Sequence, residues 1–274
     1  MISLLHYFSP QPIIYDFGFI SLRWYGLLMS IAMLAAIALS IHIGKRYLNI
    51  EKEKIFDLAF WLIIVGLICA RLYDVFLQLP YYLNHPGQIL QIWQGGLAIH
   101  GGIIGGLIVI YFFGKKHNLS FFKLTALVAP GLALAQAIGR WGNYFNQELF
   151  GLPTTVPWGI PIIATRRPFS YLSAEFFHPT FLYESLGCLI IFVVLLLIYG
   201  WAKHKNRIGH FFYVWLTSVY VISYSLLRFC LEFIRLDETP SFIGLRWPQI
   251  ISLLAVAVAI LIIIKNKNVL AQKN

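Results

Sequence analysis

The chain has 274 residues, of which 59% are hydrophobic and only 12% are charged, and its mean hydropathy is +0.75. Soluble globular domains carry about 25% charged residues, so this composition offers too little polar surface for a fold exposed to water. We therefore expect an integral membrane protein. Disorder, a solenoid and a disulfide-stapled secreted module are excluded, and the net charge of +10 has to be interpreted against a membrane rather than as a sign of nucleic-acid binding.

Apolar runs bounded by charged residues or by Gly and Pro predict an all-α protein with seven transmembrane helices, because one crossing needs about 20 apolar residues. The predicted helices lie near residues 19–44, 55–79, 97–114, 120–139, 179–201, 208–234 and 247–264. The first eighteen residues contain Asp16 and no Lys or Arg, so we expect no cleavable signal peptide. With no repeat or linker in the sequence, we expect residues 1–274 to form a single transmembrane domain.

Lysines are placed asymmetrically along the chain. Ten of the eleven fall in the connections 45–54, 115–118 and 202–207 or in the tail 265–274, which share one side of the membrane if all seven helices cross. By the positive-inside rule that side is the cytoplasm. The N-terminus is then outside and the C-terminus is cytoplasmic.

Arginines follow the opposite pattern, since eight of the ten fall in the outer halves of helices or in outer connections: Arg23, Arg71, Arg140, Arg166, Arg167, Arg228, Arg235 and Arg246. The guanidinium group is a planar fork that binds phosphate or carboxylate at two points. A single arginine could be explained by a side chain that extends toward the lipid headgroups, whereas eight together favour an anionic ligand at the outer face.

Between helices four and five, residues 140–178 are too polar and too rich in Gly and Pro to cross the membrane. We expect them to form a small external cap with short strands.

The third helix begins with His100 followed by glycines. Gly101 and Gly105, and likewise Gly102 and Gly106, are four residues apart, which is typical of close helix packing. An imidazole can exchange a proton near neutral pH, so His100 is a candidate base. The alternative is a histidine that only takes part in packing.

The sixth helix carries Tyr224, Arg228, Glu232 and Arg235, at steps of four, four and three that keep them on one face. Because charges facing lipid are costly, this face is predicted to line a cavity in the bundle. A purely structural Arg228–Glu232 ion pair is the alternative, and the surplus arginine favours an anionic ligand.

The segment 139–151, GRWGNYFNQELFG, places Arg140, Asn143, Asn146 and Glu148 in a short stretch bounded by glycines. It resembles the signature of the prolipoprotein diacylglyceryl transferases. The resemblance extends to RWYG at 23–26, IHGGIIGG around His100, HPTFLYE at 178–184 and YSLLRFCLE at 224–232. One departure is Phe181, where the family pattern leads us to expect a polar residue similar to Gln.

The resemblance implies transfer of the diacylglyceryl group of phosphatidylglycerol to the lipobox cysteine thiol of a prolipoprotein, which forms a thioether and releases glycerol phosphate. It implies as partners phosphatidylglycerol, prolipoprotein signal peptides with a lipobox cysteine and membrane lipids, with no nucleic acid and no cofactor. The implied location is a bacterial cytoplasmic (inner) membrane, with the active site toward the outer face.

The same resemblance suggests the site residues. We assign catalytic roles to His100, Arg140 and Arg228, and substrate-binding roles to Tyr25, Arg140, Asn143, Asn146, Glu148, Gly151, Tyr224, Glu232 and Arg235. No metal site is expected, because the sequence shows no close cluster of His, Cys and carboxylate residues.

The chemistry requires a thiolate, because the thiol form of cysteine is a poor nucleophile. His100 could take the thiol proton, or arginines could stabilise the thiolate, and the sequence leaves both routes open. The sequence also leaves open a different class of function, a carrier or exporter for an anionic lipid. We find, however, no pair of similar halves of the kind that common transporters have.

Overall fold

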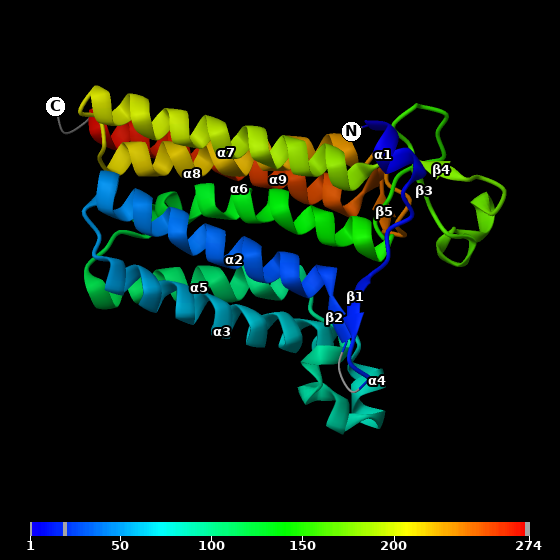
Figure 1. Cartoon of the computed structure of the whole chain (residues 1–274). Coiled ribbons are helices and arrows are strands. Elements are labelled where there is room, and N and C mark those ends of the chain that lie inside the picture. Colours follow the sequence, from blue (N-terminus) through cyan, green and yellow to red (C-terminus); the bar gives the residue numbers. More distant parts are fainter. Residues whose placement is uncertain (1, 19–20, 272–274) are drawn as a thin grey trace. The chain divides into compact units, whose positions relative to one another are not determined.

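The computed structural model describes residues 2–18 and 21–271 of the chain, which form long helices connected by loops, some of which contain short strands (Figure 1). The α-helices are α1 (Ile2–Tyr7), α2 (Trp24–Ile43), α3 (Lys52–Leu77), α4 (Leu79–Asn84), α5 (Ile99–His117), α6 (Phe121–Asn146), α7 (Thr180–His204), α8 (His210–Leu231) and α9 (Trp247–Ala271). The strands are β1 (Ile13–Asp16), β2 (Ser21–Arg23), β3 (Ile160–Pro161), β4 (Phe176–Phe177), β5 (Ser241–Phe242) and β6 (Leu245–Arg246). They form antiparallel pairs, β1 with β2, β3 with β4 and β5 with β6.

Among the described residues, seven helices are long and apolar enough to cross a membrane, which confirms the predicted fold class. They cover residues 24–48, 52–77, 99–117, 121–146, 180–204, 210–231 and 247–268. Residues 19–20 of the first predicted helix lie outside the described residues. The protein is therefore a multi-pass membrane protein.

The fourth of these helices, α6, differs from its prediction because it continues beyond residue 139 to Asn146. The helix continues through Gly142. A glycine is needed at this position because a Cβ atom would lie 2.7 Å from Cδ2 of Tyr25. The helix ends where Gln147 adopts a positive φ of 50°. The first half of the signature segment is thus helical.

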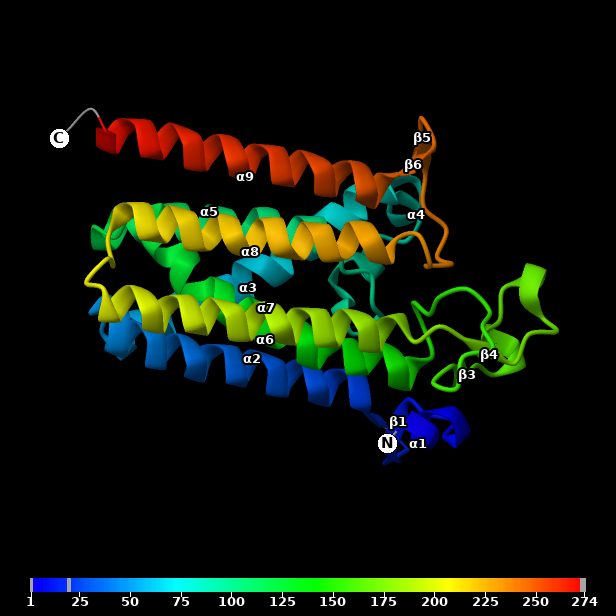
Figure 2. The ribbon, with the colours of Figure 1, turned by 90° about the horizontal axis from the view of Figure 1, so that it is seen from above.

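The chain divides into two compact units, unit 1 with residues Met1–Leu39 and Val128–Asn274, and unit 2 with residues Ser40–Leu127. In unit 1, α7 packs against α8 and α8 packs against α9 (Figure 2). In unit 2, α3 packs against α5. The expectation of a single domain stays a prediction.

The connection between α6 and α7 in unit 1 contains the predicted short strands. β3 and β4 pair in the register Ile160↔Phe177 and Pro161↔Phe176. Ile160 and Phe177 of these strands belong to a core of buried side chains: Tyr144, Phe150, Ile160, Ile162, Phe177 and Phe181. The ring of Phe181 stacks on Tyr144 at 4.6 Å, which explains why an apolar residue stands at this position.

Packing of α3 against α5 in unit 2 depends on two of the predicted glycines. A Cβ atom at Gly101 would collide with the carbonyl oxygen of Cys69, and one at Gly105 would lie 2.8 Å from Cys69 Cβ. Gly102 and Gly106 have only ordinary contacts at 3.8 Å. The Gly101–Gly105 pair therefore allows the two helices to approach closely.

Candidate active site

Glu184, near the start of α7, joins three helical segments of unit 1. Its Oε1 atom lies 2.7 Å from Nη2 of Arg140 on α6, and it accepts a hydrogen bond of 3.1 Å from the hydroxyl of Tyr224 on α8. Its Oε2 atom lies 3.6 Å from Nη1 of Arg235. Only 1% of the Glu184 side chain is exposed, so two guanidinium groups and a hydroxyl take the place of water around a buried carboxylate.

Glu232, which caps the end of α8, plays a similar part for a second pair of arginines. It forms an ion pair with Arg228, and its Oε1 atom lies 3.1 Å from Nε of Arg246. The hydroxyl of Thr239 donates to the same oxygen at 3.4 Å. Arg140, Arg228, Arg235 and Arg246, here called the arginine cluster, thus gather around two buried carboxylates.

The signature segment extends this network along α6. Nη1 of Arg140 donates to Oδ1 of Asn143 at 3.2 Å, and the amide of Asn143 donates to Oε1 of Glu148 at 2.8 Å. Asn146 donates to the same oxygen at 3.3 Å. Because the chain turns back after the helix, the N–H of Glu148 also binds the carbonyl of Asn143 at 3.0 Å. Four predicted site residues therefore form one hydrogen-bonded chain.

Gly151 lies where three segments meet. A Cβ atom there would lie 2.8 Å from the carbonyl oxygen of Ile234 and 2.9 Å from both Cβ of His178 and Cγ2 of Thr180. The Gly151 backbone also pairs with Arg235 in an isolated antiparallel bridge. Gly151 therefore places the signature segment directly beside the chain that carries Arg235.

Arg235 lies beyond the helix on which we expected it, because α8 ends at Leu231 and the chain then turns. Its Nε lies 2.8 Å from Oδ1 of Asp237. Burial raises the pKa of Asp237, but the hydrogen bond and the charge of Arg235 outweigh it, so this pKa lies below its ordinary value. The apparent surplus of arginine on this stripe is thus offset by Glu184 and Asp237.

Exposure and contacts with the protein together separate the arginines that can touch a ligand from those that cannot. The side chains of Arg140, Arg228 and Arg246 are 22%, 17% and 23% exposed, whereas that of Arg235 is 5% exposed. Arg140 and Arg228 can therefore reach a bound anion directly, whereas all three guanidinium nitrogens of the equally exposed Arg246 contact protein acceptors. Arg235 faces Glu184 and Asp237 instead.

Two further predicted residues lie at the edge of this arrangement or outside it. Tyr25 is 38% exposed, and its ring packs on Gly142 of α6. His100 belongs to unit 2, where its exposed ring lies 5.9 Å from that of Tyr73. Its part in a site with the arginine cluster stays a prediction.

Four of the eight outer arginines lie outside the arginine cluster. Arg71 in unit 2 donates to the carbonyls of Gln88, Ile89, Gly95 and Gly96 at 2.6–2.9 Å. Arg167 donates to the carbonyls of Ile162 and Leu172. Arg71 and Arg167 thus hold their own loops, and Arg23 and Arg166 are exposed.

Sequence reasoning missed Glu184 and Arg246 as members of the site. Glu184 carries a signal in the sequence, because it is an acidic residue at the start of an apolar run and ends the HPTFLYE stretch. Arg246 carries none beyond its outer position, since its partners lie in the irregular segment 232–239.

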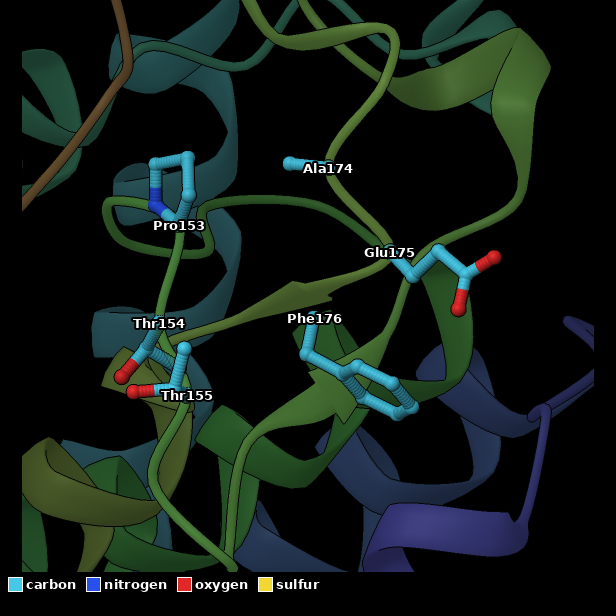
Figure 3. A pocket seen from close by; sticks show the side chains of 6 residues that line it. All are labelled: Pro153, Thr154, Thr155, Ala174, Glu175 and Phe176. Atoms are coloured by element: carbon cyan, nitrogen blue, oxygen red, sulfur yellow. The ribbon is translucent and has the colours of Figure 1, made fainter.

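A shallow depression on the segment between α6 and α7 is separate from these residues. It is lined by Pro153, Thr154, Thr155, Ala174, Glu175 and Phe176 (Figure 3). Its charged side chain, Glu175, is acidic and would repel a phosphate. The depression therefore does not suit the anionic ligand that the arginine cluster suits.

Comparison with known proteins identifies the same family that the signature segment resembles. A family model described as prolipoprotein diacylglyceryl transferase matches residues 12–265. The chain is 43% identical over 255 residues to a phosphatidylglycerol–prolipoprotein diacylglyceryl transferase of Acaryochloris marina, covering 92% of this chain and 89% of that protein. It is 42% identical over 261 residues to the protein of the same name from Synechococcus elongatus, covering 94% and 88%.

Proposed function

The chain belongs to the prolipoprotein diacylglyceryl transferase family, and we propose that its arginine cluster holds the phosphate of the lipid donor. The enzyme is a transferase that moves a diacylglyceryl group from phosphatidylglycerol to a prolipoprotein, the first step of lipoprotein maturation. A lipid carrier is not favoured, because the relatives are named as transferases.

In the proposed reaction, the acceptor is the thiol of the lipobox cysteine next to a prolipoprotein signal peptide. Its thiolate sulfur attacks the carbon of the diacylglyceryl group that is bonded to the phosphate oxygen. A carbon–sulfur bond forms, the carbon–oxygen bond to the phosphate breaks, and glycerol phosphate leaves with the electron pair. The thiol proton passes to a base or to solvent.

The observation that carries this proposal is the combination of fixed and exposed groups at Arg140 and Arg228. Each guanidinium is bonded to a buried carboxylate, which fixes its direction, yet each retains exposed surface. A guanidinium stays charged at all working pH values and can bind two phosphate oxygens. Preorganised charges of this kind stabilise the negative charge that grows on the leaving phosphate.

Glu184 and Glu232 are better suited to orient the arginines than to accept the thiol proton. Their side chains are 1% and 0% exposed, and each contacts two arginines. A base must come within hydrogen-bonding reach of the thiol. The two proposed routes from the sequence therefore both stay open: His100 takes the thiol proton, or Arg140 and Arg228 stabilise the thiolate.

The same geometry supports a proposed orientation in the bacterial cytoplasmic (inner) membrane. In unit 1, Arg140 and Arg228 stand near the C-terminal ends of α6 and α8, and Glu184 stands near the N-terminal start of α7. Lys203 and Lys265 lie in the C-terminal parts of α7 and α9. Lysines at one end of the helices and the arginine cluster at the other end support the proposal that the cluster lies at the outer face and that the C-terminus is cytoplasmic.

Mass spectrometry tests the proposed transfer directly. Purified protein in phosphatidylglycerol nanodiscs is incubated with a lipobox peptide and with a matched peptide in which serine replaces the cysteine. We expect a diacylglyceryl mass increment on the cysteine peptide only, together with release of glycerol phosphate. Movement of lipid between vesicles without any adduct would instead indicate the carrier.

A further inference from the structure

Arg246, at the end of β6, is surrounded by polar groups of the segment 232–239. Its Nε donates to the hydroxyl of Thr239 at 2.8 Å and lies 3.1 Å from Oε1 of Glu232. Its Nη1 donates to the carbonyls of Glu232 and Arg235 at 3.1 and 2.7 Å, and its Nη2 donates to the carbonyl of Asp237. All three nitrogens of the guanidinium are thus bonded to the protein.

These contacts reach both neighbouring arginines of the cluster by different routes. Glu232, which binds Arg246 through its carboxylate, also forms the ion pair with Arg228. Arg235 is held through its own backbone carbonyl. We propose that Arg246 is a positioning residue of the transferase site, which fixes Arg228 through the Glu232 carboxylate and Arg235 through the backbone; this inference rests on the proposed role of the arginine cluster.

The hairpin β5–β6 explains how Arg246 comes to face this segment. Ile243 and Gly244 at its turn adopt positive φ values of 52° and 75°, which reverses the chain. The backbone N–H of Arg246 then donates to Oε1 of Gln249 at 3.0 Å, at the start of α9. The guanidinium is therefore anchored at the beginning of a transmembrane helix and extends back to the end of the preceding one.

Arginine fits this position and lysine does not, because the contacts depend on a rigid fork with several donors. A lysine could keep the ion pair with Glu232, but its single ammonium group could not reach three carbonyls, a hydroxyl and a carboxylate from separate nitrogens. Small displacements of a group that acts on the substrate can cost up to about a hundredfold in rate. Arg246→Lys should therefore impair the enzyme although it keeps the charge.

Arg167 provides a matched control in the same unit. It donates to the carbonyls of Ile162 and Leu172 at 2.8 and 3.0 Å, so it also holds a loop outside the membrane-spanning helices. Its contacts are to backbone atoms of the segment between α6 and α7, away from Glu184 and Glu232. Arg167→Lys therefore measures how much activity and stability are lost when a guanidinium that binds only a loop is removed.

The experiment compares kcat, KM for phosphatidylglycerol and Tm of the full-length protein with those of Arg246→Lys, Arg246→Gln and Arg167→Lys. We expect kcat/KM to fall about tenfold to a hundredfold for both Arg246 variants, with a raised KM, and to change less than about twofold for Arg167→Lys. A merely structural role would reduce the active fraction and so lower the apparent kcat while leaving KM unchanged. That result, or kcat/KM within twofold of the parent for Arg246→Lys, overturns the inference.

A double-mutant cycle with Glu232→Gln tests the route through the carboxylate. If Arg246 acts on Arg228 through Glu232, the loss of activity in the double variant Glu232→Gln with Arg246→Gln should be smaller than the product of the two single losses, and the loss beyond that of Glu232→Gln alone reports the backbone route to Arg235. Losses that multiply would contradict this route. A parent protein that forms no adduct would reject the proposed function itself. An active parent together with an Arg246→Lys variant of unchanged kcat/KM would reject only the role of Arg246.

Discussion

Arg140 on α6 and Glu184 on α7 form an ion pair with a separation of 2.7 Å between Nη2 and Oε1. The same oxygen accepts the hydroxyl of Tyr224 on α8, so one buried atom connects three consecutive transmembrane helices. Because a carboxylate buried without such partners would be strongly unfavourable, the direction of the Arg140 side chain is fixed by the packing of the helices.

Glu184→Gln should therefore damage both stability and activity. The amide keeps the size of the side chain but leaves Arg140 and Arg235 without the buried charge they face. Removing one partner of a buried pair costs about 3–5 kcal/mol, which should lower Tm and reduce transfer. Glu175→Gln, at an exposed position of the same unit, is the control. A Glu184→Gln protein with parent-like Tm and transfer rate would show that the network is dispensable.

Arg140→Lys and Arg228→Lys test the need for a fork-shaped cation at the proposed phosphate site. Lysine keeps the charge but offers a single point of contact, so stabilisation of the leaving phosphate should be lost. We expect kcat to fall about a hundredfold to a thousandfold, measured as the initial rate of adduct formation at saturating phosphatidylglycerol. Arg166→Lys, which changes an exposed arginine, should retain the parental rate. Full activity of either cluster variant would exclude that arginine from charge stabilisation.

Much of the fold was predictable because apolar runs of the right length and a biased placement of charge are local properties of the sequence. Seven helices follow from them, as does an insert between the fourth and fifth. The signature residues Arg140, Asn143 and Glu148 were also predictable, since spacing along one helix and the turn after it brings them together.

Other parts of the site depend on how distant segments pack, which spacing alone does not encode. Arg235 was expected on a helix, but α8 ends before it and the chain pairs with Gly151 instead. Arg71 was one of the eight outer arginines that together favoured an anionic ligand, and carbonyls of residues 88–96 surround its guanidinium. Loop carbonyl groups can bind an arginine in place of a ligand, and such loops leave no periodic pattern in the sequence.

Gly151→Ala should perturb the site through the backbone. The added methyl group would meet the carbonyl oxygen of Ile234 at 2.8 Å, next to Arg235, and a backbone atom cannot rotate away. Overpacking of this kind costs about 1–3 kcal/mol, and we expect a lower Tm together with reduced transfer. In the control Gly200→Ala, the new methyl group has open space on α7, so stability should be unchanged or slightly increased. Parent-like behaviour of Gly151→Ala would mean that the segment can shift without affecting Arg235.

The pH dependence of His100→Gln distinguishes the two routes to the thiolate. If His100 takes the proton, its loss should lower kcat/KM at neutral pH by about a hundredfold or more. The rate of the variant should then rise toward pH 9, because an ordinary cysteine thiol ionises near pH 8.5 and supplies thiolate without a base. The parent should show a flatter profile over the same range. His85→Gln, at an exposed position of unit 2, controls for the loss of an imidazole. If His100→Gln matches the parent at pH 7, the arginine cluster must supply the thiolate, and His100 has no part in the reaction.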